Sequence, residues 1–222
     1  VKPLLAQMEA GRIPNEQDGA VQLLIAKLGD ADDLGIVYKL LMKEGAIPAS
    51  RRASLVDTLA RATRDRKVVP AGDLNTIQTL LNSDEPGLRA AAVRAIGAWK
   101  VDSLRPRLLE LAGGADTPQE TRASALDALI QLGGEESRKR VEELAVVGKS
   151  AQIQAQALAS LISIDPKGAA RSYAKWLGRL APENYPEAGT VLTRFLERKD
   201  GPDQLIEALS RQSSPPISPG NC

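Results

Sequence analysis

Histidine does not occur among the 222 residues of this chain. It is the side chain most often used as a general base in enzymes and the commonest protein ligand for transition metals. The chain also lacks the short motifs of common enzyme sites, namely the P-loop, GxGxxG, HExxH, CxxC and GxSxG. These absences predict no catalytic residue, no cofactor-binding residue and no metal ligand, so we expect no enzymatic activity from this chain by itself.

The chain also contains few cysteine and aromatic residues and carries almost no net charge. Cys222 is the one cysteine, so an internal disulfide is excluded and the compartment stays open. Aromatic residues make up 3% of the chain, so alanine and leucine must fill the core, which suits closely packed helices. No apolar run approaches the roughly 18 residues needed to span a bilayer. The formal net charge of +1 provides no general attraction to nucleic acid or anionic membranes.

The chain does contain an internal repeat. An apolar pair three residues apart recurs in Ala-rich segments every 32 to 37 residues, and an alanine precedes it by three positions in four copies. The copies are Val56/Leu59, Val93/Ile96, Leu126/Leu129, Leu158/Leu161 and Leu192/Phe195, with Val21/Leu24 as the candidate for a sixth. The i, i+3 spacing favours helices. We expect the shared alanine, such as Ala90 or Ala123, to be the point of closest helix contact.

Each copy of the repeat is followed by residues that end one helix and begin the next. Asp165-Pro166 predicts an N-cap followed by proline in the first turn, and Thr117 to Glu120 predicts a capping box. Gly113-Gly114 and Gly133-Gly134 stand where helices must end. The pattern predicts an all-α fold, an α-α superhelix of about six antiparallel helix pairs. We expect a single repeat domain over residues 1–212 and a disordered Pro/Ser tail over residues 213–222.

The segment DEPGLRAAAVRAIGAW, residues 84–99, resembles a HEAT repeat, with Asp84 and Pro86 preceding the helix face that contains Ala90, Val93 and Ile96. The likeness is to the short HEAT-like form also described as phycobilisome-lyase-type, and it covers roughly residues 18–210. It implies a HEAT-like solenoid that serves as a scaffold for a protein partner or for flanking domains. We therefore interpret the chain as a segment of a larger multidomain bacterial protein.

A narrower resemblance extends from Arg66 to Ala145. This run is similar to the HEAT segment of large secreted bacterial proteins in which a dehydrogenase module precedes the repeats and a c-type haem domain follows. The chain has no CxxCH motif to attach haem. The resemblance implies a spacer in a periplasmic or secreted oxidoreductase; without it, a cytoplasmic location is expected.

One set of charges lies on a single helix face. Lys167, Arg171, Lys175 and Arg179 follow one another every four residues with no acid between them, and Trp176 borders them. Like charges at this spacing cost a few tenths of a kcal/mol per pair, so helix stability does not favour them. We predict a candidate partner-binding site from these five residues. The alternatives are a solvated face neutralised by adjacent repeats and, for Trp176, packing between helices.

A non-catalytic scaffold or protein–protein interaction module, acting as a monomer, is the function we expect. One alternative is the spacer of a membrane-associated dehydrogenase. Another is a weak nucleic-acid binder of HEAT-like fold, against which the net charge of +1 argues.

Overall fold

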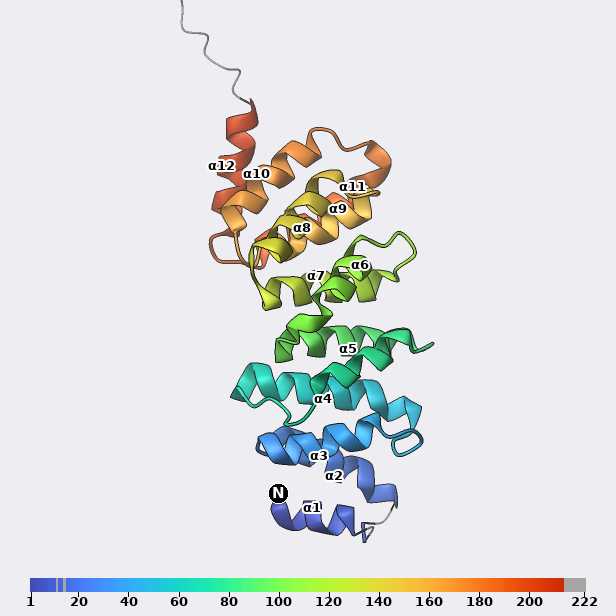
Figure 1. The fold of residues 1–222 in the computed structure, drawn as a ribbon. Helices are drawn as coiled ribbons and strands as arrows, with labels where there is room; N and C mark the ends of the chain where they lie inside the picture. Colours follow the sequence, from blue (N-terminus) through green and yellow to red (C-terminus); the bar gives the residue numbers. More distant parts are fainter. Residues whose placement is uncertain (11, 14, 214–222) are drawn as a thin grey trace, which may run out of the picture. The chain divides into compact units, whose positions relative to one another are not determined.

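The computed structural model describes residues 1–10, 12–13 and 15–213, which form α-helices and three 3₁₀ helices with no β-strand among them (Figure 1). The all-α prediction is confirmed. The α-helices are α1 (Lys2–Glu9), α2 (Asn15–Leu28), α3 (Ala31–Met42), α4 (Ala49–Arg66), α5 (Pro86–Trp99), α6 (Arg105–Gly113), α7 (Gln119–Leu132), α8 (Glu135–Val147), α9 (Ala151–Leu161), α10 (Pro166–Leu177), α11 (Tyr185–Leu196) and α12 (Gly201–Ser213). The 3₁₀ helices are η1 (Leu74–Asn82), η2 (Asp102–Leu104) and η3 (Pro182–Asn184).

The chain divides into two compact units, Val1–Gly133 and Gly134–Cys222. A single repeat domain over residues 1–212 stays a prediction. Of the expected tail, Ser213 is the last residue of α12, and residues 214–222 lie outside the described residues.

In the first unit, helices that begin successive repeats pack on one another. Helix α2 contacts α4, α4 contacts α5, and α5 contacts α7 (Figure 1). Each of the first three is followed by a second helix, respectively α3, η1 and α6. The second element after α4 is thus a 3₁₀ helix of nine residues in place of an α-helix. Stacking like helices lets each pair cover the apolar face of its neighbour.

The second unit repeats this arrangement. Helix α9 packs on α11, and α10 packs on both α8 and α12. The links are short, and Asp165 caps α10 by accepting a hydrogen bond from the Gly168 amide at 2.9 Å. Pro166 is the first residue of that helix, so the predicted N-cap followed by proline is confirmed.

The repeated apolar pairs are buried in the core in the middle of the chain. In α4, α5, α7 and α9 both members of the pair are at most 5% exposed. The register shifts by one residue at either end. In α11 Val191 is buried and Leu192 only half-buried, while in α2 Ile25 is buried and Leu24 is 41% exposed. The candidate sixth copy, Val21/Leu24, is therefore wrong in register although its helix exists.

The point of closest approach between α5 and α7 is a glycine. A β-carbon built on Gly97 would lie 2.7 Å from the α-carbon of Ala128 and 2.8 Å from its β-carbon. Ala90 is fully buried, but Ala123 is partly exposed, so the shared alanine is not the contact point in every repeat. Gly97 lies at the fourth position after the first apolar residue, Val93, where a side chain has no room.

Arginine side chains bind the carbonyl groups at helix ends. Arg66 donates to the Gly29 carbonyl beyond α2 at 2.9 Å, and Arg105 donates to the Gly133 carbonyl beyond α7 at 2.7 Å. Arg122 is 3% exposed and donates to three carbonyls, those of Gly114, Ala115 and Thr117. Burial lowers the pKa of Arg122 from its ordinary value. The bonds from Arg66 and Arg105 satisfy carbonyls just beyond helix ends, and those from Arg122 hold the loop between α6 and α7.

The predicted capping box at Thr117 is wrong. Pro118, in an extended conformation, occupies the N-cap of α7, and no side chain caps that end. A capping box does form at α3, where Asp30 and Asp33 each accept from the other's backbone amide. At α7 the conformation of Pro118 places the helix start one residue later than the motif requires.

Candidate functional site

The basic stripe predicted from the sequence lies on α10 and the turn after it. Lys167, Arg171 and Lys175 are exposed on the helix. Helix α10 ends at Leu177, earlier than the spacing predicts, so Arg179 lies in the following turn, where it is also exposed. Its Nε donates to the Lys175 carbonyl at 3.3 Å, which keeps Arg179 next to the helix end.

The stripe differs from the charged face of α8 in its ion pairing. Among the described residues, Lys167, Arg171 and Arg179 form no ion pair with an acid. On α8, by contrast, Arg138 pairs with Glu142 at 2.8 Å and Arg140 pairs with Glu143 at 3.3 Å. The cations Arg138 and Arg140 of α8 thus belong to an ion-paired face, whereas Lys167, Arg171 and Arg179 have no such acidic partner among the described residues.

Trp176 does not belong to the exposed surface, which corrects its place in the predicted site. Its side chain is 4% exposed, and its Nε1 donates to Gln154 Oε1 at 2.6 Å. The amide nitrogen of Gln154 in turn donates to the Val146 and Gly148 carbonyls, both at 3.2 Å. Gln154 thereby joins the end of α8 to α10, and Trp176 serves inter-helix packing.

The buried side of α10 anchors the stripe to its unit. The Tyr173 ring lies 6.0 Å from that of Trp176 and 5.9 Å from that of Phe195 on α11. The Tyr173 hydroxyl donates to the Ala188 carbonyl at 3.1 Å, and burial raises the pKa of that hydroxyl. Because these contacts hold the opposite side of α10, the cations face solvent on a supported helix.

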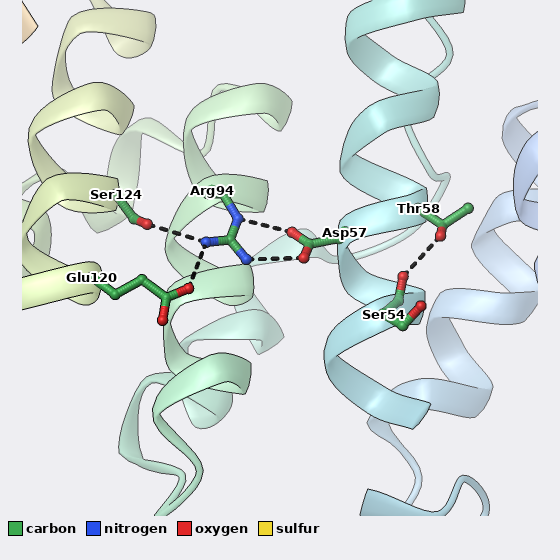
Figure 2. Close-up of polar contacts among 6 residues, drawn as sticks. All are labelled: Ser54, Asp57, Thr58, Arg94, Glu120 and Ser124. Atoms are coloured by element: carbon green, nitrogen blue, oxygen red, sulfur yellow. Dashed lines mark hydrogen bonds and ion pairs between the residues drawn. The ribbon is translucent and has the colours of Figure 1, made fainter. Parts of the chain in front are cut away.

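A second polar cluster, which was not predicted from the sequence, lies in the first unit. Arg94 on α5 binds both carboxylate oxygens of Asp57 on α4, each at 2.9 Å (Figure 2). Its Nη1 also reaches Ser124 at 3.3 Å and Glu120 at 3.4 Å, both on α7. The bond to Asp57 raises the pKa of Arg94. Asp57 and Arg94 each directly follow the first apolar residue of their copies, which is the signal that could have paired them.

Because Arg94 joins three consecutive first helices, we expect it to stabilise their stacking. A double-mutant cycle of Asp57→Ala and Arg94→Ala should show a coupling of about 1 kcal/mol, since the pair is bidentate and about 70% buried. The measurement is urea unfolding followed by circular dichroism. The exposed Arg138–Glu142 pair is the matched control, with about 0.3–0.5 kcal/mol expected. Equal coupling in the two pairs would contradict a stacking role for Arg94.

The described residues form neither a metal-binding cluster nor a membrane-spanning helix. Within residues 1–10, 12–13 and 15–213, no group of three or more His, Cys, Asp or Glu side chains is arranged to hold a metal ion. None of the helices in that part of the chain combines the length and the apolar character that a membrane crossing requires.

Comparison with known proteins shows which family part of the chain matches. No curated protein and no solved structure matches the chain. The resemblance to HEAT segments of secreted dehydrogenase–cytochrome proteins therefore stays a prediction. Residues 75–162 match the family model of HEAT repeats, the class of helical repeats that generally mediates protein–protein interaction and is typically non-catalytic. Together with the stacked helix pairs before and after that segment, this match supports a HEAT-like repeat protein.

Proposed function

We propose that the chain is a non-catalytic interaction module that binds an acidic protein surface through the α10 stripe, formed by Lys167, Arg171, Lys175 and Arg179. The observation that carries the proposal is the exposure of all four cations, three of them without an ion pair among the described residues. Cations spaced by one helical turn repel one another. An acidic partner would relieve that repulsion, so the stripe has more to gain from binding than a mixed surface does.

The geometry of the stripe favours a polypeptide partner. Lys167, Arg171 and Lys175 lie on neighbouring turns of α10, with a rise of about 6 Å from one to the next, and Arg179 lies just beyond the helix end. Carboxylates four residues apart on a partner helix have the same separation. Proteins that bind nucleic acid usually present a broad basic surface. The chain's net charge of +1 provides no such general positive potential.

Charge reversal of the three unpaired cations tests the proposal. The variant Lys167→Glu, Arg171→Glu, Arg179→Glu should lose binding to poly-glutamate, measured by fluorescence anisotropy at low salt. In a quantitative pull-down from the source organism it should also lose acidic proteins that the unaltered chain retains. The matched control is Lys139→Glu, Lys149→Glu, Lys199→Glu, three exposed cations elsewhere in the same unit, which should leave both results unchanged.

Two outcomes would contradict this function. One is equal retention of partners by the stripe variant and the control variant. The other is a salt-dependent gel shift of a DNA duplex that the stripe variant abolishes while poly-glutamate binding is absent, which would establish the nucleic-acid alternative instead.

A further inference from the structure

Two consecutive glycines link the two compact units of the chain. The first unit ends at Gly133 and the second begins at Gly134. Helix α7 ends at Leu132 and α8 begins at Glu135, so these two glycines are the whole connection between the helices. Their φ angles are +74° and +82°, and no other two consecutive residues in the described part of the chain both have positive φ.

The backbone conformation of this link requires glycine at both positions. The ψ angle is −162° at Gly133 and 156° at Gly134. Positive φ combined with such an extended ψ is essentially restricted to glycine. Packing does not impose the glycine at the first position, because a β-carbon on Gly133 would meet no heavy atom within 4 Å. The link therefore combines free backbone rotation with open space beside Gly133.

The other pair of consecutive glycines in the chain is of a different kind. Gly113 is the last residue of α6, and Gly114 has a φ of −68° and a ψ of 126°, which residues with side chains also adopt. A β-carbon on Gly114 would collide with the side chain of Thr117. Glycine makes room for close packing there, whereas at the link between the units it allows an unusual backbone conformation.

Each glycine of the link is held by the unit to which it belongs. The Gly133 amide donates to the Leu129 carbonyl at 3.0 Å, and the Gly134 carbonyl accepts from the Arg138 amide at 3.2 Å. These bonds fix the end of α7 and the start of α8. Rotation about ψ of Gly133 and φ of Gly134, on either side of the peptide group between them, would turn one unit against the other and break neither bond.

Arg105 restrains this rotation. Its Nη1 donates at 2.7 Å to the Gly133 carbonyl, which belongs to the peptide group that would have to turn. The Arg105 side chain is 13% exposed and forms an ion pair with Asp102, so it is anchored within the first unit. A hydrogen bond from a charged donor is stronger than one between neutral groups. The bond from Arg105 thus holds the Gly133 carbonyl, and with it ψ of Gly133, in one orientation.

We infer that Gly133-Gly134 is a hinge between the two units and that Arg105 is the latch that restrains it. Release of the latch changes the direction in which the second unit, with the α10 stripe, is presented, and leaves the fold of each unit as it is. The hinge depends on the backbone of the link and on Arg105. It does not depend on what the stripe binds.

Pulsed electron paramagnetic resonance measures the distance between two spin labels and tests the inference. In a Cys222→Ser background, labels at Asn82→Cys and Lys199→Cys span the link, whereas labels at Lys27→Cys and Asn82→Cys lie within the first unit. All three labelled positions are exposed. Arg105→Ala should widen the distance distribution across the link at least about twofold and leave the distribution within the first unit unchanged.

Arg107→Ala is the matched control, because Arg107 lies on the same helix and pairs with Glu110 instead. It should leave both distributions unchanged, and Arg105→Lys, which keeps a cationic donor, should restore most of the narrow distribution across the link. An Arg105→Ala distribution across the link as narrow as that of the unaltered chain would overturn the inference. So would equal widening by Arg107→Ala, or equal widening within the first unit, since Arg105 would then support the fold of that unit and not the link.

Discussion

Gly97→Leu is expected to lower the free energy of unfolding by at least about 3 kcal/mol, the upper end of the usual cost of overpacking a core. Even the β-carbon of alanine would lie 2.7 Å from the Ala128 α-carbon, which is backbone and cannot rotate away. Helices α5 and α7 would have to separate, and the contacts of the Arg94 cluster would be strained with them. Gly97→Ala should cost about 1–3 kcal/mol, despite the better helix propensity of alanine.

Gly87 on the same helix is the matched control. A β-carbon there would meet no heavy atom within 4 Å. Gly87→Ala should therefore leave the free energy of unfolding unchanged or raise it by up to about 1 kcal/mol, through helix propensity alone. Urea unfolding followed by circular dichroism gives both values. If Gly97→Ala is as stable as Gly87→Ala, the close approach of α5 to α7 is wrong.

Phe195→Ala is expected to lower the free energy of unfolding by about 3–5 kcal/mol, the range for emptying a buried aromatic site. Phe195 is the one phenylalanine of the chain and is fully buried. Its ring packs 5.9 Å from that of Tyr173, whose hydroxyl is itself bonded to α11. Because this hydrogen bond fixes the Tyr173 ring, we expect that ring not to move into the cavity.

Phe195→Leu is the control for volume, because leucine keeps most of the apolar bulk. We expect it to cost about 1.5 kcal/mol or less. The two variants are compared by urea unfolding followed by circular dichroism. A loss below about 1 kcal/mol for Phe195→Ala would contradict the central packing role of this ring.

The candidate site was predictable to the extent that it depends on local spacing. Lys167, Arg171 and Lys175 share one face because residues four apart on a helix always do, and the structure exposes all three. Trp176 could not be assigned in the same way. Its burial depends on Gln154, 22 residues away, whose side chain also binds the end of α8. No local pattern shows that a tryptophan beside a basic stripe turns toward another helix.

The Arg94 cluster likewise combines positions that the sequence repeat predicts with a helix packing that it does not. The repeat register places Asp57 and Arg94 at equivalent positions in consecutive copies, but their ion pair requires α4 and α5 to lie side by side at one particular offset. The carboxylate of Glu120 and the hydroxyl of Ser124 enter the cluster from α7 only because Gly97 lets that helix approach closely.

By itself, the sequence determined the helical class, the period of the repeat and the absence of histidine-based chemistry, because these depend on composition and on spacing along one helix. Only the tertiary structure decided which apolar residues are covered. Leu158 and Leu192 occupy the same position of the sequence repeat, yet Leu158 is fully buried and Leu192 is only half-buried, because Val191 takes the buried position in α11. The physical reason is that a side chain is buried only where a neighbouring helix packs against it. Neighbouring helices cover Leu158 in α9, whereas α11 packs one residue out of that register and buries Val191 in place of Leu192.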